Sequence, residues 1–468
     1  MKSPLLKRFR VLFAVLFFIS VLALFVDFKN VIPSKFYNIL LSLQFIPSLL
    51  KFYDLKTILA GGFIAIIILT FITGRTYCSF LCPLGIGQDI FSRIGGKLRK
   101  KFRRYGFKKP FTVTRYFFLG ASIIVTIVWG ISLLTLLDPY SIFGRFMTFF
   151  GKPAILWLNN LLAGVLIKFD IYTLSHITIK GFPILTYSVP LFFLFFIGTL
   201  SLAKGRLFCN MICPVGTFLG LLSKVSLFRI KIDESACQKC SRCSIGCKGS
   251  CIDFLHNKID VTRCVSCFNC VNICPDKAIS YGLVNIKKKP ELKETDENKR
   301  KFIVGSILLL LGLPTSLKAQ EKQVPSPKKA STVKENRTCP VVPPGAISVA
   351  DFNTDCTACS LCISACPNEV LEPSFLQYGI QGIMQPIMNY HKSFCTYNCT
   401  RCTEVCPTNA LHPLVAEAKK LVQIGKVNFI KDNCIKKQKR LVVVHVPKLV
   451  LLKLSLWCHM KEILKFLN

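Results

Sequence analysis

The sequence contains few acidic residues and few histidines. Its 468 residues include 24 Asp and Glu against 61 Lys and Arg, and only six His. Six scattered histidines supply no pair on facing helices to hold a haem, so no haem is expected. The formal net charge of +37 raises the question of nucleic-acid binding, but the basic residues cluster beside apolar runs, most densely in "KLRKKFRRYGFKK" (97–109). That distribution is typical of the positive-inside bias of membrane proteins, and no nucleic-acid partner is expected.

Cysteine, by contrast, is abundant. The 24 cysteines fall mostly in C-x2-C-x2-C-x3-C arrays. A secreted disulfide scaffold would be small and would lack membrane spans, so that class is excluded. Closely spaced cysteine runs of this kind are typical of iron–sulfur cluster ligands.

Long uncharged apolar runs occupy the first half of the chain. About 20 apolar residues cross a bilayer, and four runs have this length, at roughly 11–28, 55–73, 115–137 and 184–203. The run 153–169 is shorter and carries Asn159 and Asn160 at its centre, so we expect an interfacial or re-entrant helix on the outer side. The prediction for residues 1–229 is an α-helical membrane domain of four transmembrane helices, built as two similar halves.

The remainder of the chain divides by composition. Residues 230–285 are predicted to form a cytoplasmic two-cluster ferredoxin domain of the α+β bacterial type, and residues 339–430 a second one in the periplasm. Between them, 286–338 combine a charged linker, a translocating hydrophobic segment, "FIVGSILLLLGLPTSLKAQ", and a polar linker. We therefore expect a multi-pass protein of the bacterial inner membrane, with residues 230–300 cytoplasmic and residues 320 onward periplasmic.

The first pair of arrays has the spacing of two-cluster bacterial ferredoxins, in which the fourth cysteine of each run binds the other cluster. Cluster one is expected on Cys237, Cys240, Cys243 and Cys274, and cluster two on Cys264, Cys267, Cys270 and Cys247. Zinc is disfavoured because it normally uses two C-x2-C knuckles rather than cysteine triplets. Cys251 is left over and is a candidate alternative ligand.

The second pair of arrays follows the same crossed logic. Cluster three is expected on Cys356, Cys359, Cys362 and Cys406, and cluster four on Cys395, Cys399, Cys402 and Cys366. In the last run the first gap is three residues instead of two, which makes Cys395 the least certain ligand. Four [4Fe-4S] clusters are thus expected.

A different motif occurs twice in the membrane half, as "GRTYCSFLCPLG" (74–85) and "GRLFCNMICPVG" (205–216). Cysteines four apart face one side of a helix, and the following proline ends its regular hydrogen bonding. Flanking Lys and Arg place both copies on the cytoplasmic side, where the two pairs could meet. Cys78, Cys82, Cys209 and Cys213 are candidates for binding a metal or a further cluster, for forming redox-active dithiols, or for packing as small apolar groups.

These motifs carry a family resemblance. The two C-x3-C-P motifs, "LDPYSIFGR" (137–145) and the first ferredoxin pair resemble the NapH/MauN membrane polyferredoxins. The later "TCPVVPPGAIS", "DFNTDCTACSLCISACP" and "CTRCTEVCPTNAL" resemble their periplasmic partners, the NapG/MauM ferredoxins. The chain therefore resembles a fusion of the two up to about residue 430, and proteins that share the Cys-Pro motifs include NosR and CcoG.

The resemblance implies electron transfer from the membrane quinol pool through 4Fe-4S clusters to a periplasmic reductase or other redox partner. Relatives that share these motifs have different partners, so the terminal acceptor stays open. An assembly or maturation factor for a metalloenzyme and a redox sensor are the alternatives. No residue indicates where quinol binds.

The tail does not continue the pattern. After "NFIKDNC" the residues 431–468 contain no cluster spacing, although the resemblance implies another unit there. Reading the codons in a shifted frame from Arg440 permits "ACPTKAV", close to the chain's own "VCPTNAL" (405–411). We interpret this tail as frameshifted or truncated relative to the family; a genuine basic amphipathic tail is the alternative, and resequencing the locus decides between them.

Overall fold

The fold is taken from a computed structural model that describes residues 5–27, 30–55, 61–98, 105–129, 134–179, 181–284 and 340–422. The expected linker with its translocating segment, 286–338, and the tail 431–468 lie outside the described residues. The predictions made for them therefore stay predictions.

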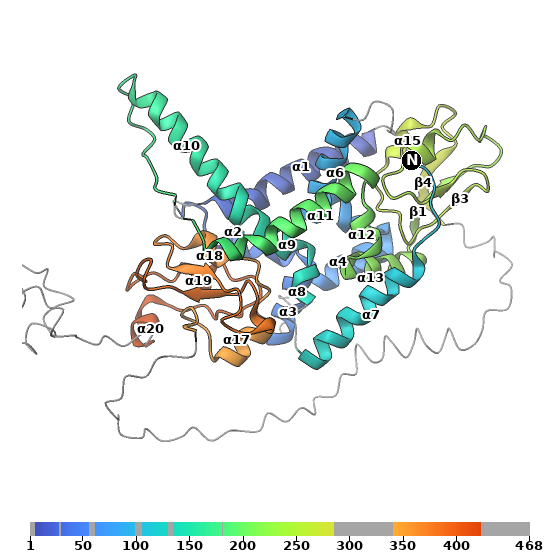
Figure 1. The fold of residues 1–468 in the computed structure, drawn as a ribbon. Helices are drawn as coiled ribbons and strands as arrows, with labels where there is room; N and C mark the ends of the chain where they lie inside the picture. The colour runs from blue at the N-terminus through green and yellow to red at the C-terminus, as the bar shows by residue number, and fades with distance from the viewer. Residues whose placement is uncertain are drawn as a thin grey trace, which may run out of the picture. The chain divides into compact units, whose positions relative to one another are not determined.

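The first half of the chain is helical (Figure 1). Its helices are α1 (Leu5–Val26), α2 (Ser34–Ser42), α3 (Phe45–Leu55), α4 (Gly62–Thr73), α5 (Tyr77–Phe80), α6 (Pro83–Leu98), α7 (Thr112–Trp129), α8 (Leu134–Leu137), α9 (Pro139–Phe146), the π-helical η3 (Met147–Gly151), α10 (Lys152–Ile167), η4 (Ile184–Tyr187), α11 (Ser188–Lys204), α12 (Leu207–Met211), α13 (Pro214–Leu222) and η5 (Ser223–Val225).

Three helices in the described ranges are long and apolar enough to cross a membrane, at Leu5–Val26, Pro139–Ile167 and Ile184–Lys204. The first and third correspond to two of the four expected spans. The other two expected spans contain shorter apolar helices, Gly62–Thr73 and Thr112–Thr126. The chain is a membrane protein, and its four transmembrane helices built as two similar halves stay a prediction.

The segment 153–169, expected to lie at the outer surface, instead continues the helical stretch that starts at Pro139. Its two asparagines do not interrupt the helix because both side chains find partners. Asn160 donates to the Ile177 carbonyl at 2.7 Å and accepts from the Ile177 N–H at 2.9 Å, and Asn159 donates to the Ser175 carbonyl. Apolar side chains such as Trp157 cover the rest of α10 and are exposed, as expected of a lipid-facing surface. Figure 1 shows α10 projecting from the other helices.

The first cysteine-rich segment, residues 228–284, is a small α+β unit. It contains β1 (Phe228–Ile232), α14 (Arg242–Ile245), β2 (Ile252–Asp253), β3 (Lys258–Ile259), α15 (Asn269–Ile273) and β4 (Ile279–Leu283). Strands β1 and β4 pair antiparallel, with Ile230 opposite Tyr281, and β2 pairs with β3. The short helices each begin inside a cysteine run, so the strands and helices together hold the two runs against each other.

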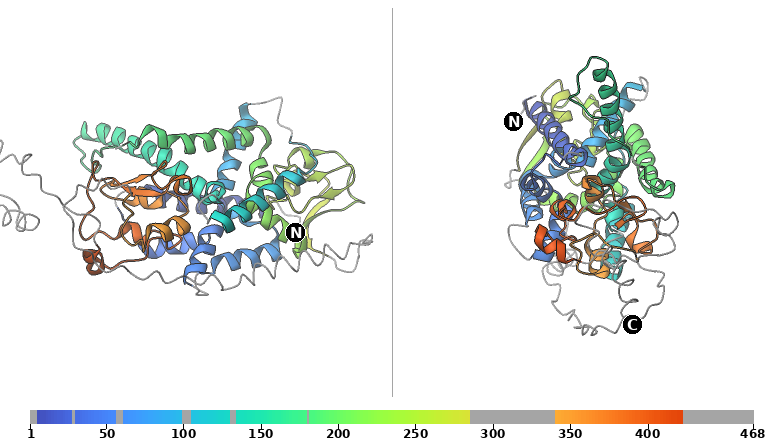
Figure 2. Two further views of the ribbon diagram at one scale, coloured as in Figure 1. Left: turned by 60° about the horizontal axis from the view of Figure 1, so that its bottom comes forward. Right: turned by 90° about the vertical axis from the view of Figure 1, so that its left-hand side faces the viewer.

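The second cysteine-rich segment, residues 340–422, has less sheet. It contains α17 (Val349–Asp355), α18 (Leu361–Ala365), β5 (Leu371–Pro373), η6 (Ile380–Gly382), β6 (Pro386–Met388), α19 (Arg401–Glu404) and α20 (Ala416–Leu421). Strands β5 and β6 pair antiparallel. Figure 2 shows the two segments as separate groups, the first in yellow-green and the second in orange to red.

The two segments contact opposite ends of α1. Near its start, Leu6 packs against the buried cluster that contains Cys247 and Cys270 of the first segment. Near its end, the Phe25 carbonyl accepts a hydrogen bond from the Ser364 hydroxyl of the second segment. A helix of 22 residues is about 33 Å long at 1.5 Å per residue. The length of α1 therefore separates these two contacts.

Candidate iron–sulfur sites

Three of the four cysteine runs share an unusual backbone pattern. The residues directly before and after the second cysteine of the run both have positive φ. These pairs are Lys239 (φ 53°) and Ser241 (60°), Ser266 (49°) and Phe268 (57°), and Ala358 (50°) and Ser360 (62°). Left-handed residues curl the chain and turn its N–H groups to one side, which creates a concave site for a negatively charged group. Non-glycine residues adopt this conformation at a cost, so its threefold repetition indicates a functional requirement.

The run that begins at Cys395 departs from this pattern. Cys399 has no left-handed neighbour among its flanking residues, and Thr400 has φ −112°. This is the run with the extra residue in its first gap. All four runs nevertheless share a left-handed residue three positions after their last cysteine. Those residues are Ser250, Lys277, Glu369 and Asn409.

The first segment gathers its cysteines around two cavities. Each cavity takes three cysteines from one run and one from the other. The first is lined by Cys237, Cys240, Cys243 and Cys274; the second by Cys264, Cys267, Cys270 and Cys247, with Cys251 beside them. The second segment has the same crossed arrangement. One cavity is lined by Cys366, Cys395, Cys399 and Cys402. Burial, followed by the proximity of the other thiols of the set Cys356, Cys359, Cys362 and Cys406, raises the pKa of Cys362 well above its usual value.

Cys251, the cysteine left over by the spacing, lies at the second cavity. Its Sγ is 3.4 Å from Cys247 Sγ, and it is almost completely buried. The hydrogen bond between the two thiols is the main cause that lowers the pKa of Cys247 to about 7. The first segment therefore has nine cysteines near its cavities, whereas the second has eight in its described residues.

The four cysteines of the two C-x3-C-P motifs also lie together. Cys78, Cys82, Cys209 and Cys213, here called the four-cysteine site, are each only 3–4% exposed. Burial, followed by the charges of Cys209 and Cys78, raises the pKa of Cys82 well above its usual value. The fold thus brings the two motifs into one site, although they are far apart in the sequence.

Each half of this site makes the same contacts as the other. The Gly85 N–H donates to Cys82 Sγ at 3.4 Å, and the Gly216 N–H donates to Cys213 Sγ at 3.3 Å. A Cβ on Gly85 would lie 2.4 Å from the Cys78 carbonyl oxygen. A Cβ on Gly216 would likewise lie 2.3 Å from the carbonyl oxygen of the first cysteine in its own motif. Only glycine allows these close approaches.

Two buried arginines each donate a hydrogen bond to the opposite motif. Arg75, from the first motif, donates to the Cys209 carbonyl at 3.2 Å and lies 3.8 Å from Cys78 Sγ. Arg206, from the second motif, donates to the Cys78 carbonyl at 2.6 Å. Both side chains are completely buried. These contacts give the arginine at the start of each motif a structural role.

A buried carboxylate beside this site joins several elements. Asp89 of α6 forms ion pairs with Arg10, with Arg206 at 2.9 Å and with Lys248 at 3.2 Å. Burial opposes ionisation of Asp89, but these cations outweigh it and lower its pKa below the usual value. Because Lys248 directly follows Cys247, this group of charges fixes the first segment to the helices.

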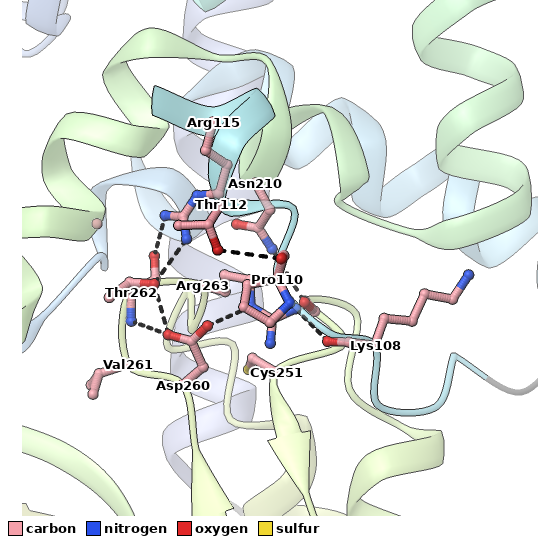
Figure 3. A network of polar contacts seen from close by, with 12 residues as sticks. Lys108, Pro110, Thr112, Arg115, Asn210, Cys251, Asp260, Val261, Thr262 and Arg263 are labelled. Atoms are coloured by element: carbon pink, nitrogen blue, oxygen red, sulfur yellow. Dashed lines mark hydrogen bonds and ion pairs between the residues drawn. The ribbon is translucent and has the colours of Figure 1, made fainter. Parts of the chain in front are cut away.

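A second polar network holds the loop that precedes Cys264 (Figure 3). The Thr262 carbonyl accepts from Arg75 at 2.7 Å and from Arg115 at 3.3 Å. Arg263 donates to the Lys108 carbonyl and to Asp260. Arg75 of the first C-x3-C-P motif therefore links the loop before Cys264 to the four-cysteine site.

One continuous apolar core contains cysteines from all three regions. Cys267 of the first segment, the four-cysteine site and Cys359 of the second segment belong to the same buried cluster. Within the described ranges, no group of three or more His, Cys, Asp or Glu side chains converges on a single metal ion.

Comparisons with known proteins agree with this chemistry. A 4Fe-4S binding domain matches residues 57–104 and 185–233, and a 4Fe-4S dicluster domain matches residues 355–410. The first match covers both C-x3-C-P motifs. The ferredoxin-type protein NapH of Haemophilus influenzae is 24% identical over 48% of this chain and 68% of its own length.

The ferredoxin-type protein MauM of Methylophilus methylotrophus, from methylamine utilisation, is 28% identical over 29% of this chain and 58% of its own length. Over these stretches the chain is similar to the NapH/MauN-type polyferredoxins. An uncharacterised protein of Methanocaldococcus jannaschii is 27% identical over 48% of this chain and 71% of its own length. No solved structure matches. These matches support an iron–sulfur electron-transfer role for this chain.

The sequence predicts the cysteines of these candidate sites but not the charged residues around them. Asp89, Arg75 and Arg206 attracted no attention as candidates, although both arginines occupy the same place in a repeated motif. The repetition of the motif could have indicated that the arginines belong to the site. Nothing in the local sequence marks Asp89, because its partners come from three distant parts of the chain.

Proposed function

We propose that this chain passes electrons from the quinol pool of the bacterial cytoplasmic membrane, through [4Fe-4S] clusters, to a periplasmic reductase or redox partner. The first cysteine-rich segment would lie in the cytoplasm and the second in the periplasm. The contacts of the two segments at opposite ends of α1 carry this proposal. The basic residues Lys7, Arg8 and Arg10 at the start of α1 support a cytoplasmic position for that end.

The residues proposed to hold the clusters are the crossed cysteine sets. They are Cys237, Cys240, Cys243 and Cys274; Cys264, Cys267, Cys270 and Cys247; Cys356, Cys359, Cys362 and Cys406; and Cys395, Cys399, Cys402 and Cys366. The cavities between these thiols, and the curled loops that turn N–H groups toward them, fit a group with negative charge. Such clusters, when bound, carry single electrons.

The protein's own residues bury some of these sites and leave others near the surface. In the first segment Cys240 is exposed, whereas Cys267 and Cys270 are buried. In the second, Cys356 and Cys359 are buried, whereas Cys395 and Cys399 are partly exposed. Each segment thus has one site close to the helical core and one that an external partner can approach.

Membrane vesicles that contain the full chain test this function. Added quinol should bleach the cluster absorbance, and a periplasmic acceptor supplied on the outer side should restore it. Protease added from outside should cleave the second segment and spare the first. Clusters that dithionite reduces but quinol does not would contradict the proposal and favour an assembly factor or a redox sensor.

A further inference from the structure

We propose that Cys78, Cys82, Cys209 and Cys213 together bind one additional [4Fe-4S] cluster, located between the sites of the two cysteine-rich segments. The 4Fe-4S binding domain match covers both motifs, and the geometry assigns the four ligands to one shared cluster. The part of this cluster in electron transfer rests on the function proposed above.

The first support is the convergence of four free thiols from two repeats. All four cysteines are unbridged and buried. Cys213 lies within reach of the charges of Cys209 and Cys78, and Cys82 within reach of all three others.

The second support is a set of buried polar groups without partners. Arg206 Nη2, Gln88 Nε2, Thr217 Oγ1 and Arg75 Nε are buried and make no hydrogen bond within the described structure. Gln88 already contacts Cys209 Sγ at 3.5 Å through its amide oxygen. Buried donors left unpaired are costly, and so many around one group of thiols indicate a missing acceptor. The sulfides of a cluster are acceptors of this kind.

The third support is the charge balance. Four buried thiolates would repel one another unless positive charge is near them. Arg75 and Arg206 supply two cations, and Cys82 and Cys213 lie at the N-terminal ends of α6 and α13. The positive end of a helix dipole favours a thiolate at this position.

The position of the site connects it to both segments. Arg206 is within electrostatic reach of Cys209 and also of Cys267 in the first segment. Toward the second segment, Tyr77 has Cys82 and Asp138 as electrostatic neighbours. Tyr140 has Asp138 and Cys359 as electrostatic neighbours. The hydroxyl of Tyr140 has no hydrogen-bond partner within the described structure.

A cluster at this site would take one electron from a reduced cluster of one segment and give one electron to an oxidised cluster of the other. No bond is made or broken in the transfer. The site would thereby fill the interval between clusters at opposite ends of α1.

Iron analysis of the full chain, purified without oxygen, tests this ligand set. The Cys82→Ser/Cys213→Ser double variant should lose about four iron atoms and four acid-labile sulfides per chain, the content of one [4Fe-4S] cluster. One electron paramagnetic resonance signal of the dithionite-reduced protein should disappear with them. Tyr140→Phe, which leaves the thiols in place, should keep both. Unchanged iron, or stoichiometric zinc in the wild type, would overturn the proposal.

A milder variant covers the case in which the double variant does not fold. Thr217→Val removes only the unpaired hydroxyl and nearly preserves side-chain shape. Iron content should remain, while the midpoint potential of one signal should fall, because hydrogen bonds to cluster sulfurs favour the reduced state. Potentials identical to those of the wild type would argue against a cluster there.

This outcome is separable from that of the proposed function. Both measurements use dithionite and require no quinol. If iron is lost as expected but quinol reduces nothing, the cluster assignment stands and the quinol function fails. If quinol reduces the protein and the double variant keeps all its iron, the function stands and the additional cluster does not.

Discussion

The two cysteine-rich segments both dock on the helical core, but through different contacts. Each places one cysteine set against the helical core, where Cys267 and Cys359 share a single buried cluster. The first segment follows η5 directly and is fixed by buried charges around Asp89. The second begins after the interval 285–339 and is fixed by the ion pair of Arg401 with Asp27 and by hydrogen bonds to its backbone carbonyls. Thr148 and Lys152 donate to two of them.

This difference shows that the inward position of a cysteine set does not require one particular attachment. The left-handed loop geometry is common to both segments, whereas the docking contacts are not. The conformation of the loops is therefore set by the group that they are proposed to bind. The docking contacts are set by the local surface of the helices. The comparison can be tested by removing a ligand or a docking contact from each side.

The largest expected effect is a difference in iron content between two variants, each of which replaces the fourth cysteine of the first run in its segment. Cys366→Ser should remove about four iron atoms per chain, because the described part of its segment has no spare cysteine. Cys247→Ser should retain them, because Cys251 Sγ lies 3.4 Å away at the same cavity. Iron and sulfide analysis measures both.

The Cys247→Ser/Cys251→Ser double variant supplies the matched control and should behave like Cys366→Ser. Equal iron loss in the two single variants would show that Cys251 cannot replace its neighbour, and the two segments would then be equivalent in this respect.

The next largest effect is expected at Asp89. Asp89→Asn leaves three buried cations without their carboxylate and should lower the free energy of unfolding by about 3–5 kcal/mol. Since the pKa of Asp89 is lowered in the folded protein, its contribution is complete above the ordinary carboxyl pKa of about 4 and declines only below it. Unfolding in one detergent at several pH values measures the difference.

The exposed pair of Asp253 with His256 provides the control for Asp89. Asp253→Asn should leave the unfolding midpoint unchanged. A similar midpoint for Asp89→Asn and the wild type at neutral pH would mean that the charge cluster does not secure the first segment.

A smaller effect is expected at the second segment. Arg401 pairs with Asp27 at 3.2 Å and lies over the Tyr37 ring. Arg401→Ala should weaken docking by about 2 kcal/mol, because a buried carboxylate loses its charged partner. Hydrogen exchange should then quicken in α18 and α19 and stay unchanged in α14 and α15.

Lys420→Ala is the control for Arg401, since Lys420 contacts an exposed ring, Tyr397, within its own segment. Faster exchange in both segments after Arg401→Ala would indicate general destabilisation instead of loss of docking.

The helical half shows where local patterns are insufficient. Hydropathy predicted four spans, but the described helices α4 and α7 are shorter than the apolar runs that suggested them, and α9, η3 and α10 form one long stretch. The short run 153–169, with its two central asparagines, predicted an interfacial or re-entrant helix. Their hydrogen bonds to the chain at 175–177, which no local pattern indicates, satisfy those amides and let the helix continue.

The sequence by itself determined the cysteine runs, their spacing and the electron-transfer chemistry they imply, because three ligands of each set lie within a few residues of one another. The extra residue before Cys399 was visible there too, and the backbone departs at that run. Only the tertiary structure decided that the two C-x3-C-P motifs form one site and that Arg75 and Arg206 each donate to the opposite motif. It also decided that Asp89 pairs with cations from three distant parts of the chain. Those contacts join residues that lie far apart along the chain, and close packing, not local spacing, selects such partners.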